Sequence, residues 1–361
     1  MLILGLETSC DETAAAVLKN DRDRFLVLSD IVSSQVKLHS KFGGVVPNLA
    51  AREHLKNILP IIEKSLEEAR VKPEDIDLIS VTRGPGLIPA LLIGTETAKT
   101  LSYLWKKPLL GIHHIEGHIY ANFTDSFCPT LSFPILCIVV SGGHTQLILM
   151  KNHLNYKIIG QTLDDAAGEA FDKVARILNL GYPGGPIISQ CADEFRKNIP
   201  DIKCQISDIK FPRPMLNSDN FNFSFSGLKT AVLYLVKKNE KLLNDKNFVN
   251  AVSYEFQQAA IDVLIGKTLK AAKKYSVKTV LLAGGVSANC ELRKQLGSAI
   301  RNKLPKIKYK IPDIKYCGDN AVMIATAGFY RYEKNKESKK FQKEISNNWK
   351  NLEADADLKL N

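Results

Sequence analysis

A strand–turn–strand unit that occurs twice is the feature that most constrains the fold of this chain. The chain opens with two strand-like apolar runs, 2–6 and 13–18, joined by the polar turn ETSCDE. The same pattern returns at 135–140 and 145–150, where the turn between the runs is SGGH. Short apolar runs bounded by turn residues predict buried strands. The repetition indicates an ancient structural duplication.

Helical periodicity follows each unit, across 49–69 in the first half and across 165–178 and 249–275 in the second. Further strands are expected at 76–82, before the turn RGPG, and at 279–282, before AGGVSAN. Strand units that are each followed by helices predict an α/β protein of two similar lobes, with a ligand-binding cleft between them.

The predicted lobes also set the expected domain boundaries. A chain of 361 residues that is 45% hydrophobic can bury a sizeable core. We expect one lobe from 1–130 together with a last helix at about 320–334, and the other lobe from 131–319. The segment 335–361 is polar with few apolar anchors, so we expect a frayed, partly disordered tail.

Composition limits where the chain works and what it binds. Its seven cysteines are scattered and include no Cys-x-x-Cys pair, which favours a reducing compartment. No targeting segment precedes the first strand, and the apolar runs are far shorter than the roughly twenty residues of a membrane helix. We therefore expect a cytoplasmic protein. Its net charge of +11 attracts polyanions, with tRNA, other nucleic acid and anionic membrane as candidates.

The segment GIHHIEGHIY carries a metal-binding pattern. His114 and His118 are four residues apart, so on a helix both imidazoles project from one face, although such pairs also occur on solvated helices. The turn CGDN offers a third ligand, the carboxylate of Asp319, which could instead cap the following helix. Two imidazoles and a carboxylate suit iron(II), zinc or manganese, with open positions for substrate oxygens.

Zinc peptidases provide an alternative interpretation of the same segment. Their His-Glu-x-x-His motif places the catalytic Glu directly after the first histidine. Here Glu116 lies two residues from each histidine, about 200° around a helix, so it points away from a metal held by both. Glu116 cannot be that general base. His113 lies about 100° off the chelating face, and we expect it to pack or to form hydrogen bonds.

Three loops with paired glycines, SGGHT, YPGGP and AGGVSAN, could each bring backbone N–H groups close to an anion. A plain hairpin turn is the alternative for SGGHT taken alone. The chain contains no G-x-x-x-x-G-K-[ST] loop and no G-x-G-x-x-G in a strand-to-helix setting. P-loop and Rossmann nucleotide sites are therefore excluded.

The ordered set of motifs is specific enough to identify a family. From about residue 2 to residue 332 the chain resembles the bacterial TsaD family, on the segments GLETSCDETAAAV, SSQVKLHSKFGGVVPNLAAREH, TRGPGLIPALLIG, HHIEGH, VVSGGHTQL, DDAAGEAFDKVARILNLGYPGGP, FSFSGLKTAV, LLAGGVSAN and GDNAVMIA. The resemblance implies an α/β fold of the actin, sugar-kinase and heat-shock type, with two ribonuclease-H-like lobes around a central nucleotide cleft.

The resemblance also implies an activity. A tRNA N6-adenosine threonylcarbamoyltransferase of this family moves the threonylcarbamoyl group from threonylcarbamoyl-adenylate to N6 of the adenosine next to the anticodon, in tRNAs that read ANN codons. AMP is released. The implied partners are tRNA, a paralogous TsaB-type subunit, a TsaE-type P-loop ATPase and the synthase that makes the adenylate, and no membrane is involved.

Functional residues can be carried over position by position. The family's metal ligands fall on His114, His118 and Asp319, and we expect one divalent ion per chain, iron(II) ahead of zinc or manganese. Asp11 and Glu12 are our candidates for the base that takes the amine proton, because their loop would face the cleft. The implied adenylate-binding positions are Val139, Val140, Ser141, Gly142, Gly143, Asp172, Gly185 and Asn289.

Two departures and two alternative functions accompany the resemblance. Ser189 stands where many relatives carry an Asp, which puts one ribose contact in doubt, and Glu7-Thr8-Ser9 replaces the Asp-x-Gly of actin-type ATPases. A metal-dependent O-sialoglycoprotein endopeptidase is one alternative, against which the position of Glu116 argues. An ATPase or a nonenzymatic scaffold on the same fold is the other.

Overall fold

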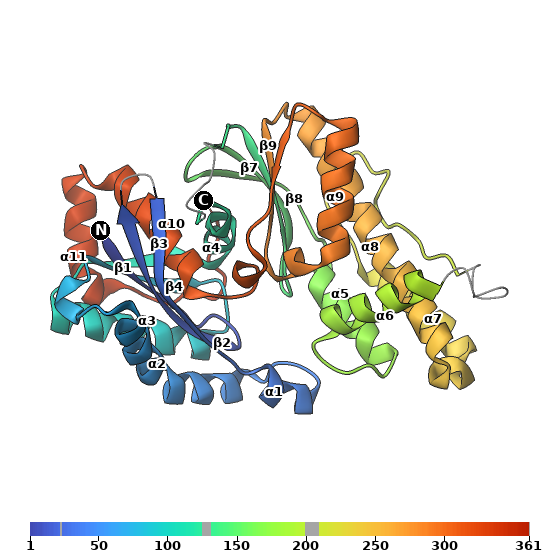
Figure 1. Cartoon of the computed structure of the whole chain (residues 1–361), viewed down its shortest axis with the longest axis horizontal. Coiled ribbons are helices and arrows are strands. Elements are labelled where there is room, and N and C mark those ends of the chain that lie inside the picture. The colour runs from blue at the N-terminus through green and yellow to red at the C-terminus, as the bar shows by residue number, and fades with distance from the viewer. Residues whose placement is uncertain (22–23, 125–130, 199–208, 361) are drawn as a thin grey trace. The chain divides into compact units, whose positions relative to one another are not determined.

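The computed structural model describes residues 1–21, 24–124, 131–198 and 209–360, which form two compact units. The first unit comprises Met1–Leu131, His153–Tyr156 and Pro312–Asn361, and the second comprises Ser132–Asn152 and Lys157–Ile311. Each unit is built on one five-stranded sheet (Figure 1).

The sheet of the first unit has the order β3-β2-β1-β4-β5. Strand β1 pairs antiparallel with β2, and β2 pairs antiparallel with β3, whereas β1, β4 and β5 run parallel. The sheet is therefore mixed, with its hairpins on one side and its crossovers on the other. The strands are β1 (Leu2–Glu7), β2 (Glu12–Asp21), β3 (Arg24–Ser34), β4 (Leu78–Gly84) and β5 (Leu109–His113).

Helices cover both faces of this sheet (Figure 1). Leu4 and Leu6 on β1 belong to the core that includes side chains of α2 and α3. Gly5, between them, faces the other way, and a Cβ there would lie 2.2 Å from the Ala321 carbonyl oxygen of α10. Alternation along the strand therefore fixes which helix packs on which face. The helices are α1 (Val36–His39), α2 (Pro47–Ala69), α3 (Ile88–Trp105), α4 (His114–Tyr120), α10 (Ala321–Asn335) and α11 (Lys339–Asn351).

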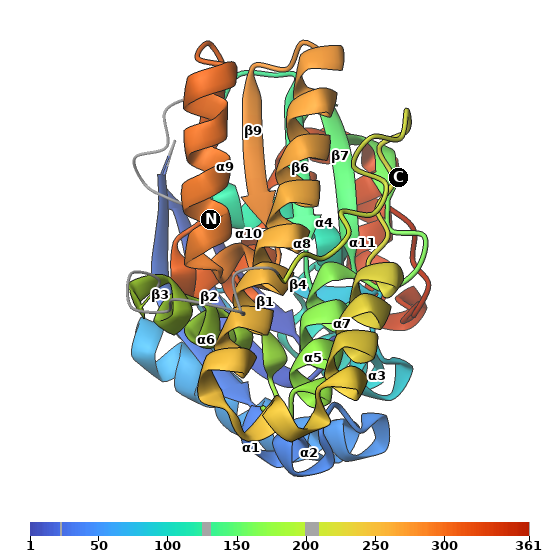
Figure 2. The ribbon, with the colours of Figure 1, turned by 90° about the vertical axis from the view of Figure 1, so that its right-hand side faces the viewer.

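The sheet of the second unit has the order β10-β9-β6-β7-β8. Strand β6 pairs antiparallel with β7 and parallel with β9, which pairs parallel with β10; Figure 2 shows β9, β6 and β7 side by side. This order and these directions repeat those of β5-β4-β1-β2 in the first unit, as the duplication predicted. The strands are β6 (Ile135–Val140), β7 (Thr145–Asn152), β8 (Asn155–Gln161), β9 (Thr279–Ala283) and β10 (Lys308–Lys310).

The core of the second unit lies between this sheet and its helices. Leu136, Ile138 and Val140, alternate residues of β6, are fully buried in one cluster with Phe171 of α5 and Phe256 of α8. Asp245 caps α8 by accepting a hydrogen bond from the Asn247 amide, which fixes where that helix begins. The helices are α5 (Ala167–Ile177), α6 (Gly184–Asn198), α7 (Ser226–Lys238), α8 (Lys246–Lys274) and α9 (Cys290–Lys303).

The structure confirms the α/β class and corrects the C-terminal end. The expected disorder of 335–361 is wrong for the described part, because α11 packs against α3 and β5. Ile345 is fully buried and Leu352 is 4% exposed within the core of the first unit. Residues 312–319, which we expected in the second lobe, belong to the first unit.

Among the described residues, no helix is at once long enough and apolar enough to cross a bilayer.

Candidate functional site

Helix α4 positions the two histidines. Strand β5 ends at His113 and the helix begins at His114, so the motif HHIEGH straddles a strand-to-helix junction. The His113 ring accepts a hydrogen bond from the Ile115 amide and its Nε2 lies 3.0 Å from the Leu358 carbonyl oxygen. His113 thus caps α4 and is turned away from the other two histidines, as expected.

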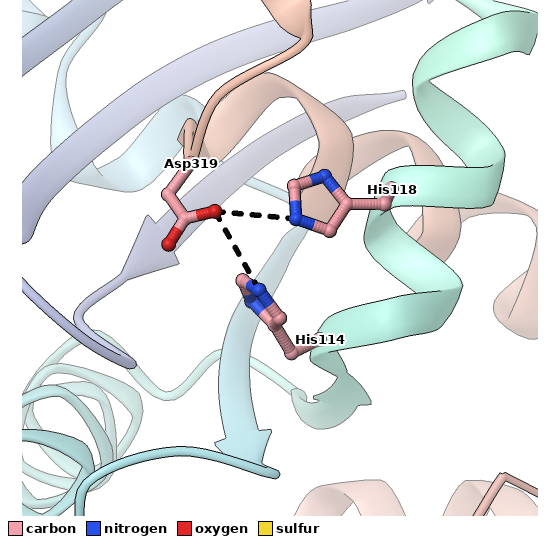
Figure 3. A group of neighbouring side chains, drawn as sticks. All are labelled: His114, His118 and Asp319. Atoms are coloured by element: carbon pink, nitrogen blue, oxygen red, sulfur yellow. Dashed lines mark ion pairs between the residues drawn. The ribbon is translucent and has the colours of Figure 1, made fainter. Parts of the chain in front are cut away.

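His114, His118 and Asp319 converge, as Figure 3 shows. The two imidazole centroids are 4.6 Å apart. Oδ1 of Asp319 lies 3.5 Å from Nε2 of His114 and 3.2 Å from Nε2 of His118. His118 is 1% exposed and His114 is 8% exposed, so the group sits at the edge of the protein interior.

These three groups fit a divalent cation. Ligand atoms that are each about 2.1 Å from one tetrahedral ion lie about 3.4 Å apart, close to both distances to Asp319. Both ring nitrogens of His118 are buried, and neither makes a hydrogen bond with another described residue. Because buried polar atoms nearly always have a partner, the unused bonding capacity of this ring, next to the Asp319 carboxylate, suits a bound cation.

Asp319 is not needed as a helix cap. Asn320 fills that role for α10, since its side-chain oxygen accepts a hydrogen bond from the Met323 amide at 2.9 Å. The capping interpretation that the sequence left open therefore applies to Asn320, and the Asp319 carboxylate faces the two histidines.

A buried carboxylate lies on the far side of His114. Oε2 of Glu7 is 3.2 Å from Nδ1 of His114, and Glu7 is fully buried. Burial by itself lowers the pKa of His114, but the negative charges of Asp319 and Glu7 raise it to about 9. The imidazole is held between two carboxylates, which makes this position strongly attractive to positive charge.

The candidate bases Asp11 and Glu12 belong to the same unit as the metal ligands. Asp11 is 7% exposed, and Glu12 accepts a hydrogen bond from the Ser34 hydroxyl at 3.0 Å. Burial, reinforced by the charges of Asp319 and Asp11, raises the pKa of Glu12 to about 9. A carboxyl group with that pKa holds its proton at neutral pH, so Glu12 can accept a proton only in its ionised form.

Glu116 lies on the other side of α4 from the histidines. It is fully buried and forms a two-pronged ion pair with Arg331 of α10, in which Nη2 and Oε2 are 2.9 Å apart. The carboxylate is thus engaged away from the candidate metal centre. The geometry agrees with the sequence argument against a peptidase base.

A cavity of about 660 Å³ lies within the second unit. Gly142, Asp172, Gly185 and Asn289 line it, which brings together four of the eight positions predicted to bind the adenylate. The other four are not among the lining residues: Val139 and Val140 are fully buried in β6, and Ser141 and Gly143 flank Gly142 in the β6–β7 turn.

Asp172 and Asn289 have structural partners in addition to their place in the cavity wall. Oδ1 of Asp172 accepts a hydrogen bond from the Gly184 amide at the start of α6. Asn289 caps α9 through the Leu292 amide, and its Nδ2 donates to Gln257. Both side chains are therefore held rigidly where they border the cavity.

The glycines in the three predicted loops differ in what surrounds them. A Cβ on Gly142 or Gly185 would meet no atom within 4 Å, so these glycines leave open space beside the backbone. A Cβ on Gly284, where φ is +88°, would lie 2.5 Å from the Val140 carbonyl oxygen. Gly284 is thus required by the fold, whereas Gly142 and Gly185 leave room for a ligand.

The cavity wall also includes residues that the sequence argument missed. Several lie on α6, beyond Ser189, which the sequence comparison had already singled out: Gln190, Asp193, Glu194 and Lys197. The signal was the helix that follows YPGGP, whose polar face could have been followed outward from the glycines.

Comparison with known proteins decides the family. The model of the tRNA N6-adenosine threonylcarbamoyltransferase family, TsaD, matches residues 26–326. The chain belongs to the TsaD family.

Relatives from two bacteria match almost end to end. The tRNA N6-adenosine threonylcarbamoyltransferase of Thermosipho africanus is 49% identical, over 92% of this chain and 95% of its own length. The Bacillus subtilis protein of the same name is 48% identical, over 92% of this chain and 91% of its own length. The TsaD resemblance seen in the sequence is thus confirmed.

A solved structure supports the fold. Full-length HypF, in its phosphate- and nucleotide-bound form, matches 93% of this chain with 47% of its own length, at a TM-score of 0.55 and 12% sequence identity. The TsaD chain has the predicted fold of the actin, sugar-kinase and heat-shock type.

Proposed function

We propose that this protein transfers the threonylcarbamoyl group from threonylcarbamoyl-adenylate to N6 of the adenosine next to the anticodon, in tRNAs that read ANN codons. AMP is the leaving group. The observation that carries the proposal is the similarity to tRNA N6-adenosine threonylcarbamoyltransferases over 92% of the chain.

The chemistry asks mainly for positioning. N6 attacks the carbamoyl carbon, which is already activated as a mixed anhydride with AMP. A C–N bond forms, the C–O bond to the phosphate breaks, and the amine gives up a proton. Holding the two reactants in register, with fixed dipoles directed at the developing charge, can supply most of the rate in such a transfer.

We assign metal binding to His114, His118 and Asp319, with one divalent ion per chain. Iron(II) is our first choice, and zinc and manganese accept the same donors. When bound, such an ion stabilises negative charge on phosphate and carbamoyl oxygens. The nearby carboxyl groups of Asp11 and Glu12 are our candidates for taking the amine proton.

The cavity of the second unit is our candidate adenylate site. Gly142 and Gly185 leave open space beside the backbone, so N–H groups and a phosphate can approach without a side chain between them. Asp172 and Asn289 border the same space with oxygens that are already oriented by helix starts. Such a rigid rim suits a ligand with ribose hydroxyls and a base.

Binding of tRNA uses the positive surface of the chain. A net charge of +11 favours contacts with phosphates, so the affinity should fall steeply with salt. The family assignment also supports a paralogous TsaB-type subunit, a TsaE-type P-loop ATPase and the upstream synthase as partners. A cytoplasmic location follows from tRNA as the substrate.

The test is reconstitution with purified components. The full chain, its partners, threonylcarbamoyl-adenylate and unmodified tRNA are mixed, and threonylcarbamoyladenosine is measured by mass spectrometry of the digested tRNA. His118→Ala and Asp319→Ala are assayed alongside. Asp219→Ala is the matched control, because the side chain of Asp219 is fully exposed and lies in the other unit.

Each outcome bears on a different part of the proposal. Product from the wild type and the control, with little from the two variants, supports both the reaction and the metal centre. Product from all four proteins supports the transferase reaction but refutes the assignment of His118 and Asp319 as metal ligands. Failure under every metal and partner condition, with phosphate release from ATP or peptide release from a glycoprotein instead, refutes the transferase.

A further inference from the structure

Glu7 is a buried carboxylate whose contacts converge on one metal-ligand candidate. It is the last residue of β1 and is fully buried. Its Oε1 accepts a hydrogen bond from the Ser9 amide at 2.5 Å, and its Oε2 accepts one from the Thr82 hydroxyl at 2.5 Å. The same Oε2 lies 3.2 Å from Nδ1 of His114. Three donors therefore surround two oxygens.

Burying an ionised carboxylate such as that of Glu7 lowers the stability of the fold unless other groups compensate for the lost solvation. An ionised carboxylate without access to water is tolerated only when hydrogen bonds replace its solvation. The neighbouring positions of β1, Leu4 and Leu6, are apolar and fully buried, so an apolar side chain could end the strand at lower cost. The strand end alone does not account for a carboxylate at position 7.

The geometry at His114 accounts for the carboxylate at position 7. Nδ1 faces Glu7, whereas Nε2 faces Oδ1 of Asp319 at 3.5 Å. A histidine that binds a metal does so as the neutral imidazole, which carries one N–H and one lone pair, and the hydrogen bond made by one nitrogen decides which nitrogen carries the proton. A carboxylate at Nδ1 accepts the N–H there, which leaves the lone pair on Nε2.

We infer that Glu7 is a positioning residue, which holds His114 in the Nδ1–H tautomer and aims its Nε2 lone pair at the cation shared with His118 and Asp319. Carboxylates behind metal-bound histidines fix ring orientation and raise ligand basicity in this way. The inference rests on the metal centre proposed above.

Two neighbours of Glu7 provide matched controls. Ser9 Oγ lies 3.1 Å from the same Nδ1, so a hydroxyl could orient the ring instead of the carboxylate. Thr82 donates to the same Oε2 that faces Nδ1 of His114, so Thr82→Val reports what a disturbed carboxylate environment does when the carboxylate itself is kept. The ring of His118 makes no hydrogen bond with a described residue, which leaves His114 as the histidine whose orientation is set.

The first experiment measures Zn²⁺ affinity by competition with a chromophoric chelator, on the full chain stripped of metal. Glu7→Gln should bind Zn²⁺ about 10- to 100-fold more weakly than the wild type. A glutamine has only one oxygen for three donors, and its amide N–H₂ facing Nδ1 would favour the tautomer with the proton on Nε2. Ser9→Ala and Thr82→Val should each change the affinity by less than about threefold, small against the change at Glu7.

The results distinguish the role of Glu7 from the metal centre itself. Unchanged Zn²⁺ affinity in His118→Ala refutes the centre. Weak binding in His118→Ala with wild-type affinity in Glu7→Gln refutes only the role of Glu7. A loss in Ser9→Ala or Thr82→Val as large as that in Glu7→Gln also overturns it, because the ring would then be set by the hydroxyl or by packing.

A second measurement needs no Glu7 variant and decides the matter if Glu7→Gln fails to fold. The wild type is labelled with ¹⁵N-histidine and loaded with Zn²⁺, and the His114 signals are assigned by their loss in His114→Gln. We expect a proton on Nδ1 and a metal-shifted Nε2. A proton on Nε2 of His114, with the metal on Nδ1, contradicts the inference.

Discussion

The ion pair between Glu116 and Arg331 joins the helix that carries both histidines to the helix that begins just after Asp319. Glu116 is fully buried, whereas the Arg331 side chain keeps about a third of its exposure, 35%. This asymmetry makes a quantitative prediction, because the two partners do not lose the same amount when the other is removed.

Arg331→Met leaves a carboxylate with no access to water and should cost about 3–5 kcal/mol of unfolding free energy. Glu116→Gln leaves a guanidinium that can still reach water, so the cost should be smaller, about 1–3 kcal/mol. The double variant removes both charges, and its cost should fall short of the sum of the two single costs by about 2 kcal/mol.

The assay is urea unfolding followed by tryptophan fluorescence. Trp105 and Trp349, the two tryptophans of the chain, both belong to the first unit, so the signal reports on the unit that contains the ion pair. The argument from burial is refuted if each single variant loses less than about 1 kcal/mol of unfolding free energy, the two losses are equal, and the double variant loses their sum.

Three further outcomes are expected. Leu352→Ala should lower the stability of the first unit by about 2–4 kcal/mol in the same fluorescence assay, because Leu352 is 4% exposed, whereas Leu59→Ala at a 61% exposed position should cost under about 0.5 kcal/mol. Partial burial raises the pKa of Asp165, but its ion pairs with Lys173 and Lys229 lower that pKa overall. The stability that this carboxylate contributes is therefore present above about pH 4 and is lost as the pH falls through the lowered pKa. Asp165→Asn should make the loss of stability in acid less steep between about pH 4 and pH 2. Gly142→Val should fold normally but weaken binding of a nonhydrolysable adenylate analogue by about tenfold or more in calorimetry, because its side chain enters open space, whereas Gly284→Ala should lower the melting temperature.

Local patterns in the sequence were sufficient for much of the fold. The apolar runs at 2–6 and 135–140 appear as β1 and β6, and the periodic stretch 249–275 appears as α8, because periodicity and turn residues act within a few positions. Strand β10, three residues long, was not predicted, since its pairing with β9 is a long-range contact.

The error at the C-terminal end has a different origin. The overall polarity of 335–361 suggested disorder, yet Phe341, Ile345 and Leu352 recur at spacings of four and seven; the first two lie one turn apart on α11, and Leu352 directly follows its last residue. The polar average composition of this segment therefore obscured the helical spacing of its few apolar residues. Ile345 and Leu352 are buried in the first unit, and these long-range contacts cannot be predicted from the local sequence.

The candidate metal ligands were accessible to sequence reasoning, but their surroundings were not. His114 and His118 share a helix, so their spacing alone predicts a common face. Glu7 is 107 positions from His114 in the chain, and only the pairing of β1 with β4, and of β4 with β5, brings the two together.

Helix capping explains why three polar residues that the sequence assigned to ligand binding differ in the structure. Asp172, Asn289 and Asp319 each lie beside the start of a helix. A side-chain oxygen at a helix start can accept a hydrogen bond from one of the first free amides. Asp172 and Asn289 provide that oxygen for α6 and α9, so their geometry is set by the fold and any ligand contact is additional. At α10 the next residue, Asn320, is the cap, and the carboxylate before it can face the histidines. The pair Asp-Asn therefore carries more information than either residue alone, because the second position fulfils the structural requirement and the first is left for chemistry.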